Sequence, residues 1–170
     1  SAFDQWIITK LGNVEGTVEE ALEQDRFSDA ASALYSFVWH EFCDWYLEFT
    51  KPVLAGDNAV AARETRSTTA WALNQMLHLL HPIMPFITEE LWQQTGGPDA
   101  ERATLLISAA WPDYEEGLTD EAAMADIDWV IRLVTEIRAV RTEMNIPPSA
   151  QIPAELHDAG EVSRRRLSDY

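Results

Sequence analysis

The sequence predicts an all-α fold, an antiparallel helix bundle, on three observations. Apolar residues make up 46% of the 170 residues, which is enough for a buried core. They recur mostly three or four residues apart, the period of an amphipathic helix, and strand-like alternation is absent before residue 150. Seven tryptophans, a high number for this length, supply large side chains to fill the space between helices.

The first two predicted helices cover residues 3–24 and 28–50. The first carries its apolar side chains on one face. The second is apolar round most of its circumference, which is typical of a helix with several neighbours. Ser28 has a suitable side chain for the N-cap of the second helix. Lys51-Pro52 is expected to end it, because the residue before a proline disfavours helical backbone.

A third helix, predicted for about 59–80, leads into the stretch HPIMPFITEELWQ (81–93), which holds two prolines in an apolar run. Pro82 lies just past the third helix. Pro85 falls in the first turn of a short fourth helix, about 84–94, where a missing N–H is harmless. The stretch is therefore expected to be a tight corner whose apolar side chains fill the core. Those side chains are Ile83, Met84, Phe86 and Ile87.

A fifth helix is expected to open at Thr119-Asp120-Glu121, with acids at the positive end of its dipole. Asn145 can end it in a left-handed cap. The segment ahead of this helix is expected to be extended and to pack Trp111 on the bundle. The apolar stripe of the fifth helix comprises Ile127, Val130, Val134, Ile137, Val140 and Met144.

Two domains follow from this pattern. The helical bundle is assigned to residues 1–148, and residues 149–170 are expected to begin a second, truncated unit of mixed structure. Alternating apolar residues near the start of the second unit predict a strand. They are Ile152, Ala154 and Leu156.

Charge is placed unevenly along the chain, whose net charge is −17. Residues 1–60 hold 11 acids and 3 bases, whereas residues 131–170 hold 6 of each. An acidic surface repels nucleic acid, so any contact with nucleic acid needs a local basic patch. Arg138 and Arg141 are three residues apart on the fifth helix and share a face, and residues 164–166 form a second arginine cluster.

The sequence contains no recognisable motif for nucleotide binding, catalysis or metal binding. Neither a Walker loop nor a GxGxxG motif is present. His78 and His81, like His40 and Cys43, are three residues apart but have no matching second pair, so helix capping and core packing are favoured over zinc. The single cysteine excludes an intramolecular disulfide and favours a cytosolic protein. We therefore expect no catalytic residues and no metal site in this chain.

Four blocks together carry a resemblance to a known family. They are ALYSFVWHEFCDWYLEFTKPVL (33–54), LLHPIMPFITEELWQ (79–93), WP (111–112) and IRAVRTEMNIPPSAQIP (137–153). In this order and spacing the chain resembles the anticodon-binding domain of bacterial valyl-tRNA synthetases, which belong to class Ia. The HP-x-x-P-F element is shared across that class. EFCDWYLE (41–48) is the discriminating block, since isoleucyl enzymes resemble only its Tyr-Leu-Glu part.

The resemblance implies a helical module that recognises the anticodon stem-loop of tRNA-Val in the cytoplasm. It would support ATP-dependent attachment of valine by a catalytic domain with HIGH and KMSKS signatures, neither of which occurs here. By itself the chain is therefore expected to catalyse nothing and to hold no cofactor; ATP and magnesium belong to the full-length enzyme. The expected partners are tRNA-Val and the remaining synthetase domains, with no membrane. Further parts of the family's tRNA-contacting region are expected outside these residues.

Within this interpretation the expected tRNA contacts are Arg138 and Arg141, together with Trp6 and Lys10 at one end of the bundle. Arginine can meet phosphates or bases, and an aromatic ring can stack on an unpaired base. Two alternatives stay open. One is an acidic protein-interaction module, which should expose an apolar groove for a partner helix where the synthetase interpretation predicts a closed core. The other is the equivalent domain of an isoleucyl or leucyl enzyme.

Overall fold

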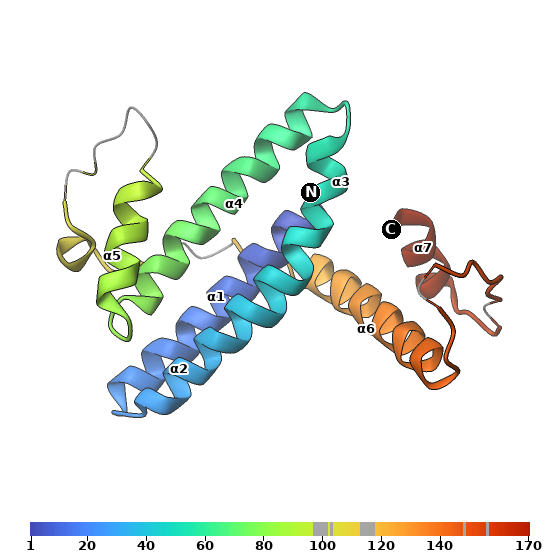
Figure 1. The fold of residues 1–170 in the computed structure, drawn as a ribbon, viewed down its shortest axis with the longest axis horizontal. Coiled ribbons are helices and arrows are strands. Elements are labelled where there is room, and N and C mark those ends of the chain that lie inside the picture. The colour runs from blue at the N-terminus through green and yellow to red at the C-terminus, as the bar shows by residue number, and fades with distance from the viewer. Residues whose placement is uncertain (97–101, 103, 113–117, 148, 156) are drawn as a thin grey trace. The chain divides into compact units, whose positions relative to one another are not determined.

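The fold is known from a computed structural model, which describes residues 1–96, 102, 104–112, 118–147, 149–155 and 157–170. All regular structure in these residues is helical, which confirms the predicted all-α class. The chain forms two compact units, residues 1–121 and 122–170 (Figure 1). The predicted domains, 1–148 and 149–170, place the fifth predicted helix with the bundle, whereas by its contacts that helix groups with the C-terminal residues. No helix of the described part is long and apolar enough to cross a membrane.

The first helices of unit 1 follow one another closely. α1 (Ala2–Glu23) matches the predicted helix over 3–24 and opens with a capping box between Ser1 and Asp4. A continuous helical run follows, made of α2 (Phe27–Ser36), η1 (Phe37–Tyr46) and α3 (Leu47–Ala55). η1 is a π-helix, so it is wider than the α-helical segments on either side.

Two details of this run differ from the prediction. Ser28 is not the N-cap, because Asp25 adopts a left-handed conformation with a φ of 56° and α2 already begins at Phe27. Pro52 does not end the run and lies inside α3, which reaches Ala55. A proline in a helix removes one hydrogen bond and crowds the carbonyl four residues earlier, and we infer that the packing of α3 on α4 (Ala59–Leu80) offsets this cost.

α4 and α5 (Pro85–Gln94) confirm the third and fourth predicted helices, and Pro85 lies in the first turn of α5. The corner between them is built differently from the prediction, because its apolar side chains are exposed. Thr88 and Trp92, one turn apart, form the buried face of α5, and Trp92 packs with Leu77 and Leu106 of η2 (Leu106–Ser108). The exposed apolar residues of the corner are Ile83, Met84, Phe86 and Ile87, at 39%, 42%, 91% and 51% exposure.

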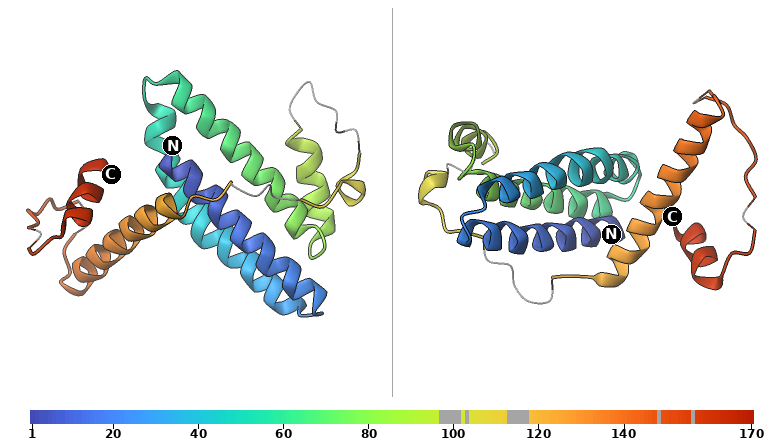
Figure 2. Two further views of the ribbon diagram at one scale, coloured as in Figure 1. Left: turned by 180° about the vertical axis from the view of Figure 1, so that it is seen from behind. Right: turned by 90° about the horizontal axis from the view of Figure 1, so that it is seen from below.

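The core of unit 1 lies where α1 meets its neighbours. α1 packs along α2 and η1 on one side and along α4 on the other (Figure 2). The largest fully buried side chains are Trp6, Tyr46, Phe37, Ile7, Leu11, Leu34, Leu79 and Val18. Trp111, expected to pack on the bundle, is 39% exposed and donates from Nε1 to Glu19 Oε1 at 2.7 Å.

Unit 2 consists of α6 (Glu121–Glu143), a connecting segment and α7 (Glu161–Asp169). α6 starts as predicted, and Asn145 follows it in a left-handed conformation with a φ of 52°. The predicted strand is wrong for residues 152–155, which have no regular structure; Leu156 lies outside the described residues. The apolar stripe of α6 is buried at Ile127 but exposed toward the C-terminal end of the helix. The open positions are Ile137, Val140 and Met144, at 47%, 50% and 66% exposure.

Candidate nucleic-acid interface

Trp6 and Lys10 lie together on α1, but only one of them reaches solvent. Trp6 is 1% exposed, and its ring meets that of Phe49 edge to face with centroids 6.3 Å apart. Lys10 Nζ lies 5.8 Å from the centroid of the Trp6 ring and 3.7 Å from Glu41 Oε1. In this structure Trp6 is therefore a core side chain that supports Lys10, and its ring offers no face to a base.

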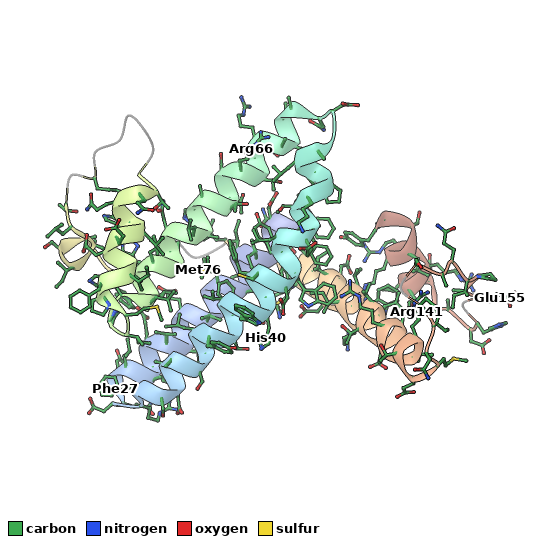
Figure 3. The ribbon with its side chains drawn as sticks, in the orientation of Figure 1. Phe27, His40, Arg66, Met76, Arg141 and Glu155 are labelled. Atoms are coloured by element: carbon green, nitrogen blue, oxygen red, sulfur yellow. The ribbon has the colours of Figure 1, made fainter. Side chains whose placement is uncertain are left out.

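Arg138 and Arg141 are one turn apart on α6, as their spacing predicts, and they differ in surroundings. Arg138 is exposed, whereas Arg141 is half-buried. The Arg141 guanidinium donates through Nη2 to the carbonyl oxygens of Pro147 at 2.8 Å and Ala150 at 2.9 Å. Figure 3 shows Arg141 near the end of α6, where the chain turns back. Arg141 thus fixes this turn as well as contributing positive charge.

The link between α6 and α7 rests on Asp126, which is 7% exposed. Arg165 Nη2 donates to both of its carboxylate oxygens, at 2.9 and 2.8 Å, and Arg166 Nε donates to Oδ1 at 2.7 Å. The hydrogen bond from Arg166 is the largest cause that holds the pKa of Asp126 below its ordinary value, and the charge of Arg165 adds to it. The guanidinium of Arg166 also lies 5.7 Å from the centroid of the Trp129 ring.

A further arginine, Arg132, lies between two shallow hollows of unit 2. The first has a volume of about 490 Å³ and the second of about 340 Å³. Arg132 and Arg166 both line the first, while Trp129 and Arg132 line the second. The sequence-based site prediction did not include Arg132 or Arg166, although the run of arginines at 164–166 was a visible signal.

Unit 2 carries much less net charge than unit 1. Residues 122–170 hold 8 acids and 6 bases, whereas residues 1–121 hold 21 acids and 6 bases. Phosphate would thus meet strong repulsion along unit 1 and little along unit 2. The predicted site residues fall into two pairs: Trp6 with Lys10 in unit 1, and Arg138 with Arg141 in unit 2.

His78, His81 and Cys43 make contacts that are typical of structural side chains. His78 Nδ1 lies 2.8 Å from the carbonyl oxygen of Asn74, and His81 Nδ1 lies 2.8 Å from Thr88 Oγ1. Cys43 is half-buried, and burial raises the pKa of its thiol. Among the described residues, no group of three or more metal-ligating side chains converges.

Comparison with known proteins places this chain in a family. The model of the family described as the anticodon-binding domain of tRNA ligase matches residues 4–156. The chain belongs to this family. The match runs from Asp4 in the first turn of α1 through the end of α6, with Arg138 and Arg141, while α7 with Arg165 and Arg166 lies beyond it.

Several relatives of this anticodon-binding chain are named valine–tRNA ligase. That of Rhizobium meliloti (strain 1021) is 49% identical over 98% of this chain, and that of Caulobacter vibrioides is also 49% identical over 98%. The valine–tRNA ligase of Bartonella quintana (strain Toulouse) is 44% identical over 99%. The chain spans 17%, 18% and 18% of the lengths of these three relatives.

Proposed function

We propose that this chain binds the anticodon stem-loop of tRNA-Val as part of a cytoplasmic valine–tRNA ligase. The observation that carries the proposal is its membership of the anticodon-binding family over residues 4–156, joined to relatives of 44–49% identity that are named valine–tRNA ligase. Attachment of valine with ATP is assigned to other parts of such an enzyme. The names of the relatives favour the valyl over the isoleucyl or leucyl alternative.

We assign the main phosphate contacts to α6. Arg138 is exposed there and Arg141 stands one turn away, on the unit whose charge is close to balanced. An arginine guanidinium donates in a planar fork that fits a phosphate. Arg141 has a second role in this proposal, since it holds the turn at Pro147 and Ala150 and so sets the shape of the surface.

Lys10 is proposed as a weaker contact, with Trp6 as its support. The Lys10 ammonium lies near both the Trp6 ring and Glu41. Its positive charge is therefore partly offset before any RNA arrives. Trp6 would act through the position of Lys10 rather than by stacking on a base.

The test is a titration of the full-length enzyme with tRNA-Val transcript at several salt concentrations. Arg138→Ala should weaken binding roughly tenfold and reduce the salt slope by about one, because one phosphate contact is lost. Arg141→Ala should weaken it at least as much, since the turn is released too. Arg63→Ala, an exposed arginine on α4, is the matched control and should change neither quantity.

Two outcomes would contradict the proposal. Unchanged affinity for tRNA-Val in both Arg138→Ala and Arg141→Ala would refute the assignment of the site. Equal affinity for tRNA-Val and for a tRNA-Val transcript with a replaced anticodon would refute the proposal that the anticodon is recognised. Circular dichroism of each variant separates loss of contact from loss of fold.

A further inference from the structure

Two hollows on unit 2 meet at the side chain of Arg132. The tryptophan hollow, of about 340 Å³, is lined by Trp129, Arg132, Leu133 and Glu136. The arginine hollow, of about 490 Å³, is lined by Ala125, Asp128, Ile131, Arg132 and Arg166. Because Arg132 belongs to both, an aromatic ring and two guanidinium groups are within reach of one small ligand.

Helix geometry separates these hollows from the arginines assigned to tRNA. The residues that line the tryptophan hollow follow the spacing i, i+3, i+4, i+7, which places them on one face of α6. Arg138 lies nine residues after Trp129, which is about two and a half turns, and so stands on the opposite face. A ligand in the hollows is therefore independent of the tRNA contacts proposed for Arg138.

The tryptophan hollow combines an apolar interior with charged groups at its edge. Trp129 and Leu133 are half-buried, whereas Arg132 and Glu136 are exposed. The guanidinium of Arg166 lies 5.7 Å from the centroid of the Trp129 ring. A tryptophan ring holds a planar partner by stacking, and a cation beside it strengthens such a contact. The hollow thus suits a flat heteroaromatic ring that also carries polar groups.

The arginine hollow carries a small excess of positive charge. Arg165 and Arg166 share the carboxylate of Asp126, and Asp128 lines the hollow, so together with Arg132 three arginines face two aspartates. Within the described part of the chain no hydrogen bond or ion pair engages Arg132, so its N–H donors are available to a ligand. An excess of one charge suits a monophosphate better than a triphosphate, whose further charges Asp128 repels.

We propose that the two hollows form a binding site for one nucleoside monophosphate whose base carries an amino group. The base lies against the Trp129 ring, because aromatic side chains hold unpaired bases by stacking. The phosphate lies in the arginine hollow, where the planar fork of Arg132 fits its oxygens and Arg166 adds positive charge. A free nucleotide and an unpaired nucleotide of an RNA present the same chemistry to this site.

Glu136 selects the base. A carboxylate only accepts hydrogen bonds, so at the edge of the tryptophan hollow it pairs with a base amino group, such as N4 of cytosine or N6 of adenine. Uracil has no amino group and turns two carbonyl oxygens to the same edge, which the carboxylate repels. Cytidine monophosphate should therefore bind better than uridine monophosphate.

Photo-crosslinking in the full-length enzyme tests the occupant. p-Benzoylphenylalanine replaces Ala125, at the exposed edge of the arginine hollow, so the tryptophan hollow stays intact. Radiolabelled cytidine 5′-monophosphate should label this position, and uridine 5′-monophosphate should label it at least fivefold less. In a second arm, tRNA-Val transcript replaces the nucleotide. A tRNA crosslink that excess cytidine monophosphate suppresses assigns the site to RNA, whereas nucleotide labelling without a tRNA crosslink assigns it to free nucleotide.

Substitutions test each part of the site through the same labelling. Arg132→Ala and Trp129→Leu should each reduce labelling by cytidine monophosphate at least fivefold, whereas Trp129→Phe should keep most of it because a ring remains. Glu136→Gln should raise labelling by uridine monophosphate to the level of the cytidine probe, since an amide both donates and accepts. Arg138→Ala, the same residue type on the opposite face of α6, is the matched control and should change nothing.

Three results would overturn the proposal. They are no labelling by either nucleotide or by tRNA, equal labelling by the two nucleotides before Glu136 is changed, and a crosslink to another segment of the protein, which would show that the hollows are covered. Equal losses in Arg132→Ala and Arg138→Ala would also overturn it, since only general positive charge would then matter. Hydrogen exchange across α6 in each variant separates loss of contact from loss of fold. Unchanged tRNA affinity in Arg138→Ala with labelling intact would refute only the assignment of the tRNA site.

Discussion

Each unit of the molecule holds a buried aspartate, and the two are satisfied by different chemistry. In unit 1, Asp4 accepts hydrogen bonds from the hydroxyl groups of Ser1 at 2.8 Å, Tyr46 at 2.8 Å and Thr65 at 3.0 Å. In unit 2, Asp126 accepts from the guanidinium groups of Arg165 and Arg166. Hydroxyl groups are the main donors to the first carboxylate, which also accepts from the Ser1 ammonium at 3.0 Å, whereas guanidinium groups from one helix fix the second.

The difference matches what surrounds each aspartate. Unit 1 buries a continuous apolar core in which hydroxyl groups can be held in place, so its stability depends mainly on packing. The described residues of unit 2 bury only Ala123, Ile127 and Asp126 itself, so α7 is attached chiefly by charge. We infer that substitutions which leave a cavity in the core lower the stability of unit 1 most. The attachment of α7 should instead depend on pH and on salt concentration.

The largest expected effect is a cavity in unit 1. Trp6→Ala should lower the free energy of unfolding by about 3–5 kcal/mol, because it empties a fully buried site. Trp111→Ala, which removes a 39% exposed ring, should cost about 1 kcal/mol or less. Urea unfolding followed by circular dichroism measures both. Similar losses in the two variants would show that burial does not decide the stability of unit 1.

The buried carboxylate of unit 1 should come next. Asp4→Ala leaves the hydroxyl groups of Tyr46 and Thr65 without this acceptor, which should cost about 2–3 kcal/mol. Asp4→Asn keeps one oxygen acceptor and should cost less. The same urea unfolding experiment ranks the two. A loss in Asp4→Asn as large as that in Asp4→Ala would mean that charge, and not the hydrogen bonds, holds this site.

The sequence was sufficient for most helices because their signals are local. Apolar periodicity predicted α1, α4, α5 and α6, and Pro85 and Asn145 marked a start and an end that the structure confirms. Pro52 failed as an end signal, and we attribute this to the packing of α3 on α4, which offsets the missing hydrogen bond and the crowding by the proline ring. The exposed corner at Phe86 could not be predicted, since apolar character alone does not say which face has a neighbour.

The candidate site shows the same limit. The spacing of Arg138 and Arg141 placed them on one helix face, because that relation needs only helical geometry. The burial of Trp6 did not follow from its residue type, since tryptophan serves both cores and RNA contacts. The pairing of Asp126 with Arg165 and Arg166 spans 39 and 40 residues, and no local pattern encodes it.

A smaller effect is expected for the attachment of α7. Asp126→Asn removes the charge that both guanidinium groups meet, which should favour release of α7 by about 1 kcal/mol. Amide hydrogen exchange in residues 161–169 should become roughly fivefold faster, while exchange in α1 stays unchanged. Glu143→Gln, at an exposed position of the same helix, is the control. Equal exchange in α7 for both variants would show that α7 is held by something other than Asp126.

The smallest effect is the pH dependence of that attachment, and its sign follows from the lowered pKa. Because the pKa of Asp126 is lower when α7 is docked, the stabilisation is complete above the pKa of a free aspartate, about 3.9. It is lost as pH falls through the lowered value. Exchange in α7, corrected for the intrinsic pH dependence of exchange, should therefore accelerate relative to α1 as pH drops below about 4. Added salt should accelerate it at neutral pH, since both arginines are partly solvated. Asp126→Asn should abolish both responses, and a response that persists in this variant would assign the acid sensitivity to another group.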